Sequence, residues 1–135
     1  MRIKQIVKNV LLKHGTRDPF EICEQLGYKV ILKQYNTDWK GEMIKLTNEN
    51  IIIYINSNLS KQAQYIVCAH ELAHAQLHLN AGNHFNGGET LEQLEMEREA
   101  DMFTAYLLLD EKEYDVKFEN MNGYLLNNVI NEFIS

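Results

Sequence analysis

The 135-residue sequence has little of what disulfide scaffolds, disordered chains and membrane proteins require. Its two cysteines, Cys23 and Cys68, are too few for a secreted disulfide framework or a four-cysteine zinc ribbon, so we expect a reducing, cytoplasmic setting. One proline and seven glycines are few for a disordered chain. The longest apolar runs, such as 51–55 and 105–109, are much shorter than the roughly 18 residues of a membrane-spanning helix. We therefore expect no membrane partner.

Positive charge is scarce in most of the chain. Residues 1–45 carry nine Lys or Arg against five Asp or Glu, but residues 46–135 carry four against fourteen, and the net charge is −6. A protein that binds nucleic acid through phosphate contacts needs a cationic surface. The sequence therefore predicts no direct contact with nucleic acid.

The chain does contain 45% hydrophobic residues in periodic patterns, which suffice for a single domain over residues 1–135. Helical spacing and capping residues predict helices, and alternating or β-branched runs predict strands. The expected helices are 3–14, 19–26, 60–79, 90–109, a short element from 110 and 124–134; the expected strands are 28–34, 41–47 and 50–56. This order predicts an α+β fold with a small, mostly antiparallel sheet packed against helices.

The most informative segment is His70-Glu71-Leu72-Ala73-His74, an HExxH motif on the long helix expected over 60–79. Residues four apart project from one helical face one turn apart, so His70 and His74 are placed to bind one metal ion. Glu71 is then the candidate catalytic base of a zinc hydrolase. The structural alternative is two hydrogen-bonded core histidines beside an unrelated glutamate.

Catalytic zinc normally takes three protein ligands, so a third should be present. The segment 97–101 on the next helix offers Glu97 and, one turn later, Asp101. A glutamate bound to zinc and an aspartate that accepts a hydrogen bond from a ligand histidine would suit these positions. The alternative is a solvated acidic helix face. His78 lies about 12 Å of helical rise beyond His70, too far to share an ion, and is a candidate helix-end or cleft residue.

Together these segments resemble the ImmA/IrrE family of zinc metallopeptidases. The likeness rests on the HELAH motif at 70–74 with Leu77-His78, and on the pattern E-x-E-A-D-x-F-x-A-x-L-L over 97–108. It covers roughly residues 20–110. Leu109-Asp110 departs from the Met-Pro that often follows the paired leucines in the family. The resemblance implies a zincin-like fold, zinc held by the two motif histidines and a downstream glutamate, and cleavage of helix-turn-helix repressors in mobile elements or stress responses.

Helical geometry favours Glu97 over its neighbours as the third ligand. At about 100° per residue, Asp101 lies about 40° from Glu97, on the same side as the apolar residues of this helix. Glu92, Glu95 and Glu99 lie about 140° to 160° away and are expected to face solvent. A carboxylate directed toward the core needs a cation or hydrogen bonds, and zinc would supply the cation.

The sequence leaves the oxyanion-stabilising residue and the exact activity open. Candidates for the oxyanion donor are His78, His84, Tyr65 and Tyr106. We expect an extended substrate segment to bind along the edge strand at 41–47. The main prediction is a zinc endopeptidase with a protein substrate. The alternatives are a zinc-holding module that binds a repressor without cutting it, and a SprT-like protease acting on DNA-bound proteins.

Overall fold

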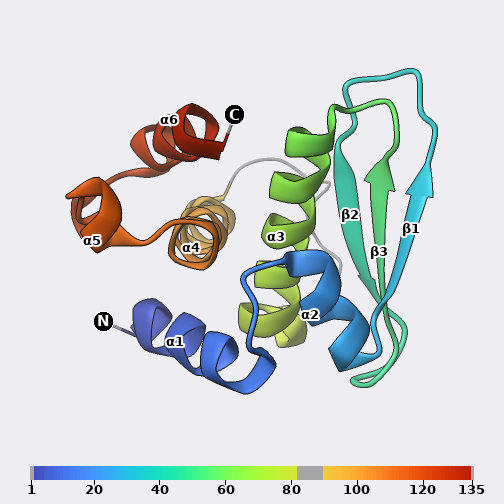
Figure 1. The fold of residues 1–135 in the computed structure, drawn as a ribbon. Coiled ribbons are helices and arrows are strands. Elements are labelled where there is room, and N and C mark those ends of the chain that lie inside the picture. The colour runs from blue at the N-terminus through green and yellow to red at the C-terminus, as the bar shows by residue number, and fades with distance from the viewer. Residues whose placement is uncertain (1, 82–89, 135) are drawn as a thin grey trace.

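The computed structural model describes residues 2–81 and 90–134 and contains a three-stranded sheet on one side of a helical body (Figure 1). The strands β1 (Lys29–Lys33), β2 (Gly41–Lys45) and β3 (Ile51–Asn56) lie in the order β1-β3-β2. β3 is central because it is the most apolar strand, and it carries the buried residues Ile51, Ile53 and Ile55. β2 is therefore an edge strand.

The α+β class predicted from the sequence is confirmed, but the sheet is mixed rather than mostly antiparallel. β2 pairs with β3 in antiparallel register, and β1 pairs with β3 in parallel register. Two short connections reverse the chain twice, so the first and third strands run in the same direction. Because β3 inserts between the other two, one of the two pairings must be parallel.

The helices form layers beside the sheet (Figure 1). α3 (Lys61–Leu77) packs on the sheet through β2 and β3, and α4 (Leu91–Leu108) packs on the opposite side of α3. α2 (Pro19–Leu26) also contacts α3, while α1 (Arg2–His14) and α6 (Gly123–Ile134) contact α4. The short helix α5 (Glu111–Tyr114) and two 3-10 turns, η1 (Leu79–Ala81) and η2 (Phe118–Asn120), complete the described elements. α3 is thus central, with the HExxH motif between sheet and helices.

Local signals in the sequence explain where the helices begin and end. The Asp18 side chain accepts a hydrogen bond from the Phe20 backbone N–H ahead of α2, and Gly27 ends that helix with a φ of 78°. Ser60 caps α3, and Thr90 forms a capping box with Gln93 at the start of α4. The helix boundaries expected from the capping residues are therefore confirmed to within a few residues.

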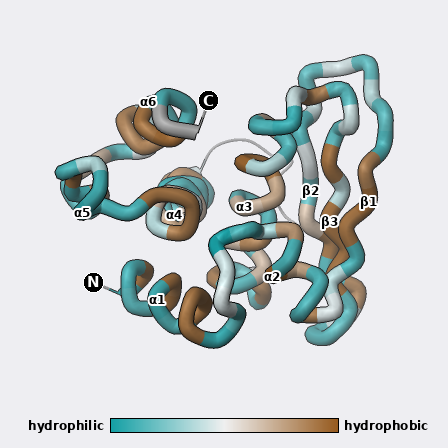
Figure 2. The backbone as a smooth tube through the Cα atoms, viewed as in Figure 1, coloured by the Kyte–Doolittle hydropathy of each residue, from teal (hydrophilic) through white to brown (hydrophobic). Residues whose placement is uncertain are grey.

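A shared hydrophobic core joins sheet and helices. Its largest fully buried side chains come from β3 and from α1, α2, α3, α4, η2 and α6; they include Ile53, Leu72, Phe103, Phe118 and Leu126. In Figure 2 hydrophobic segments lie on β1 and β3 and also on α1, α4 and α6, while hydrophilic ones predominate at the upper end of the sheet. Within the described residues, no helix combines the length and apolar character needed to cross a membrane.

Candidate metal centre

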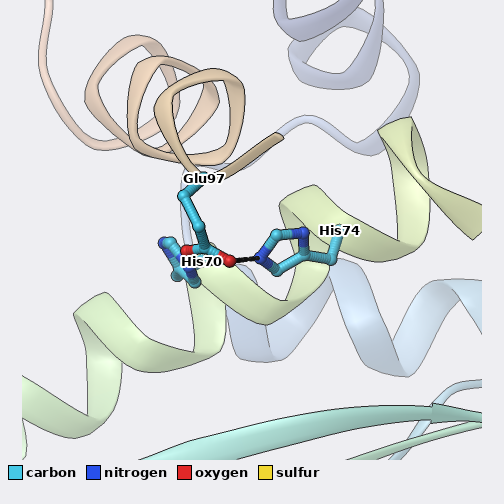
Figure 3. Close-up of side chains that lie close together, drawn as sticks. All are labelled: His70, His74 and Glu97. Atoms are coloured by element: carbon cyan, nitrogen blue, oxygen red, sulfur yellow. Dashed lines mark hydrogen bonds and ion pairs between the residues drawn. The ribbon is translucent and has the colours of Figure 1, made fainter. Parts of the chain in front are cut away.

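The two histidines of the HExxH motif point from α3 toward α4, where they meet Glu97 (Figure 3). His70 Nε2 lies 2.9 Å from Glu97 Oε2, and His74 Nε2 lies 3.0 Å from Glu97 Oε1. The two Nε2 atoms are 3.2 Å apart. The structure thus brings together the three residues that the sequence analysis proposed as ligands.

These separations suit a single small cation. A tetrahedral zinc ion with bonds of about 2.0–2.1 Å places its ligand atoms roughly 3.3 Å from one another. The 3.2 Å between the two Nε2 atoms is close to that value, and each of these nitrogens has one Glu97 oxygen at 2.9 or 3.0 Å. Two imidazoles and one carboxylate are also the donor set of a catalytic zinc site that keeps a fourth position open.

The charges around His70 also call for a cation. His70 Nε2 faces Glu97, and the other ring nitrogen, Nδ1, lies 3.2 Å from Asp101 Oδ1. Burial opposes a charged imidazole, but the hydrogen bonds with Asp101 and Glu97 prevail and raise the pKa of His70 to about 10. Burial likewise disfavours the Glu97 carboxylate, yet the two histidines hold the pKa of Glu97 well below its usual range. Two carboxyl groups, those of Glu97 and Asp101, thus flank the His70 ring on its two nitrogens, an arrangement that suits a bound cation.

Glu97 is less enclosed than its helical position predicts. Its side chain is 45% exposed, because it borders two cavities that open beside the cluster. Glu92 and Glu95 face solvent as expected, and Glu95 lies 3.7 Å from Arg98. The carboxylate that faces the histidines is therefore accessible to solvent.

Glu71 lies beside the cluster and lines both cavities. Burial raises the pKa of Glu71, while His70, His74 and a hydrogen bond from the Met43 backbone N–H act in the opposite direction. Since Met43 belongs to β2, the edge strand runs directly past this carboxylate. A buried carboxyl of raised pKa next to a metal site is suited to proton transfer.

The structure corrects the sequence-based expectation for Glu99. Instead of facing solvent, Glu99 Oε1 lies 2.9 Å from His78 Nε2, and Glu99 Oε2 accepts a hydrogen bond from Arg2 at 3.0 Å. His78 is the C-cap of α3, and its Nδ1 lies 3.0 Å from His74 Nδ1. Burial lowers the pKa of His78 despite the nearby carboxylate of Glu99. His78 thus stands behind the cluster rather than in the cleft.

Two cavities flank the cluster. One, of about 220 Å³, lies between β2 and the ligands and is lined by Gly41, Glu42 and Met43 together with Glu71. The other, of about 510 Å³, lies between α3, α4 and α6, with apolar walls that include Ile66, Leu94 and Ile130. Among the candidate oxyanion donors, Tyr65 and Tyr106 line neither cavity. His84, another candidate, lies outside the described residues.

One polar residue near the site escaped the sequence analysis. Asn127, on α6, donates a hydrogen bond from Nδ2 to Asp101 Oδ2 at 3.2 Å and lines the larger cavity. It belongs to no motif, and its approach to Asp101 depends on how α6 packs against α4. The one sequence signal for Asn127 was its place on the polar face of the helix expected over 124–134.

Comparisons with known proteins agree with this geometry. The family model described as IrrE N-terminal-like domain, of the Peptidase M78 type, matches residues 14–133. Metallopeptidase ImmA of Bacillus subtilis strain 168 is 33% identical over 126 residues, which are 90% of this chain and 72% of that protein. An uncharacterized immunity region protein 2 of Bacillus phage phi105 is 36% identical over 108 residues, 79% of this chain and 68% of the phage protein. No solved structure gives a significant match.

Proposed function

The chain belongs to the ImmA/IrrE family of metallopeptidases, and we propose that it is a zinc-dependent endopeptidase that cleaves a helix-turn-helix repressor. The observation that carries the proposal is the convergence of His70, His74 and Glu97, whose ligand atoms all lie within 4.8 Å of one another. Glu71, next to them, provides a base.

Zinc is the proposed metal because of the donor set. Two imidazole nitrogens and a carboxylate suit zinc better than calcium or magnesium, which prefer oxygen ligands only. The proposed ligands are the three residues of the cluster, with Asp101 orienting His70 through its Nδ1. When bound, the ion would supply a Lewis acid that polarises the scissile carbonyl and activates water.

The protein's own part in the reaction is proton transfer by Glu71. Its carboxylate lines the cavity between β2 and the ligands, where the scissile bond would lie. There it is placed to accept a proton from the attacking water and then to donate it to the leaving amine. The raised pKa of Glu71 helps the first step, because the conjugate base of a weaker acid accepts a proton more readily.

Substrate binding is proposed along β2. β2 is an edge strand, and the Met43 N–H points toward Glu71, so the outer edge of β2 faces the site. An extended peptide could add to this edge through backbone hydrogen bonds, which require little of the substrate's sequence. The cavity of about 510 Å³ would then receive an apolar side chain of the substrate against Ile66, Leu94 and Ile130.

The repressor substrate and the mobile-element setting rest on family membership. The phage relative is named for an immunity region, which favours a mobile-element setting for this chain as well. A cytoplasmic location accords with the buried free thiols of Cys23 and Cys68. Membership of the ImmA/IrrE family also favours a helix-turn-helix repressor as substrate over the DNA-bound proteins that a SprT-like protease would cleave.

Glu71→Gln tests whether the chain is an enzyme or only a zinc-holding module. The amide keeps the shape of the side chain but cannot accept the proton, so zinc content should stay near one equivalent while cleavage falls by at least about 10³-fold. We would measure zinc by elemental analysis, and cleavage of a helix-turn-helix repressor encoded beside this gene by gel assay. Cleavage at the wild-type rate would contradict the role of Glu71. A wild-type chain that binds the repressor without cutting it would favour the non-catalytic module.

A further inference from the structure

His78 and Glu99 form an enclosed hydrogen-bonded pair that the proposed chemistry does not use. His78 Nε2 lies 2.9 Å from Glu99 Oε1, and the two side chains are only 6% and 20% exposed. On its other side, His78 Nδ1 lies 3.0 Å from His74 Nδ1. The pair therefore stands directly behind one of the proposed ligands.

The direction of these hydrogen bonds follows from the proposed metal-binding role of His74, on which this inference rests. His74 Nε2 faces Glu97 and the Nε2 of His70, so this nitrogen must offer its lone pair to the metal. The proton of the neutral His74 ring then sits on Nδ1 and is donated to His78 Nδ1. His78 accordingly carries its own proton on Nε2 and donates it to Glu99.

Glu99 is held in turn by the first helix. Arg2, on α1, donates to Glu99 Oε2 at 3.0 Å, so both carboxylate oxygens are engaged. Arg2 is 61% exposed, so this outermost ion pair contributes little by itself. The enclosed part of the chain of hydrogen bonds consists of His74, His78 and Glu99.

We propose that His78 and Glu99 are positioning residues that hold the His74 ring with Nε2 directed at the metal. Asp101 has the corresponding place behind His70, at 3.2 Å from its Nδ1. Each ligand histidine on α3 is thus backed by a carboxylate of α4, directly for His70 and through His78 for His74. Neither His78 nor Glu99 contacts the substrate cavities.

Paired substitutions test the role of each residue through zinc affinity. His78→Leu removes the acceptor and should weaken zinc binding about 10- to 100-fold, whereas His78→Asn keeps an acceptor near the Nδ1 position and should recover most of the loss. Glu99→Ala should weaken binding about tenfold, and Glu99→Gln, which still accepts from His78, should stay within about threefold. Glu95→Ala is the matched control, because Glu95 lies on the same helix but contacts only Arg98 among the described ion pairs.

Zinc affinities would come from competition with a chelating indicator, and melting of each metal-free variant would show that it folds. Imidazole nitrogen NMR of the zinc-loaded wild type supplies a second readout and should show neutral His78 with its proton on Nε2. A proton on Nδ1 of His78, or a folded His78→Leu variant that binds zinc within about twofold of wild type, would overturn the positioning role alone. A wild-type chain that binds no zinc would overturn the proposed function, and the positioning role with it.

Discussion

At the scale of single residues, the site is organised around the two nitrogens of each histidine proposed as a ligand. The Nε2 atoms of His70 and His74 converge with the Glu97 carboxylate, while their Nδ1 atoms face Asp101 and His78. A histidine ligand needs such a partner, because the partner selects which nitrogen keeps the proton and therefore which one can bind metal. Ring orientation is thus part of the site before any metal binds.

Zinc affinity should depend on pH because protons compete for His70. In the metal-free protein the pKa of His70 is about 10, so the ring is protonated at neutral pH and must lose its proton to bind zinc. Between about pH 7 and pH 8, affinity should therefore rise about tenfold, and it should fall in mildly acidic buffer. Indicator competition at several pH values would measure this slope.

Asp101→Asn is the matched variant for this experiment. It removes one of the two carboxylates that raise the pKa of His70, so the slope of affinity against pH should flatten near neutrality. A wild-type affinity that does not change between about pH 7 and pH 8 would contradict the raised pKa.

At the scale of secondary-structure elements, the closeness of β2 to α3 depends on Gly41. A Cβ atom at this position would lie 2.6 Å from Val67 Cγ1 and 2.7 Å from the Tyr54 carbonyl oxygen. The glycine therefore lets the edge strand approach the helix that carries Glu71. This approach brings the Met43 N–H to the Glu71 carboxyl, so it also shapes the proposed substrate groove.

Gly41→Ala should therefore separate β2 from α3. We expect it to lower the free energy of unfolding by about 1–3 kcal/mol, because the clash involves a backbone oxygen that cannot turn aside. Urea unfolding of the metal-free protein would measure the loss. Gly123→Ala is the control: its Cβ would lie 3.5 Å from Asp101 Oδ2, an ordinary contact, and stability should change by less than about 1 kcal/mol. Equal stabilities for the two variants would show that the strand does not need glycine.

At the scale of the whole molecule, the proposed metal centre joins elements that are distant in sequence. His70 and His74 lie on α3 and Glu97 on α4, and η1 and the segment 82–89 separate the two helices in the chain. Unfolding would separate these ligands, so a metal that binds all three also stabilises the packing of α3 against α4.

Zinc should therefore raise the melting temperature. At a free zinc concentration about 100-fold above Kd, linkage adds about 2.7 kcal/mol of stability, which corresponds to a shift of roughly 5–15 °C for a chain of this size. Differential scanning calorimetry with and without zinc would measure the shift. Glu97→Ala should abolish most of it and Glu95→Ala should retain it; the reverse result would show that Glu97 is not the third ligand.

The sequence alone determined what depends on local geometry. A spacing of four residues places His70 and His74 on one helical face wherever the helix lies, and the same geometry puts Asp101 close to Glu97. Capping residues such as Asp18 and Thr90 act within one turn, so helix starts were predictable too. The α+β class followed from the order of these elements.

Tertiary structure decided every contact that depends on how two elements cross. Whether Glu99 meets solvent or His78 depends on the axial offset of α4 against α3. The rotation of residues around α4 alone wrongly predicted that Glu99 faces solvent. The contact of Asn127 with Asp101 depends in the same way on how α6 packs, and the parallel pairing of β1 depends on β3 inserting between its neighbours. Offsets and crossing angles arise from the joint packing of core side chains from several elements, whereas the rise and rotation of a single helix are the same in every fold.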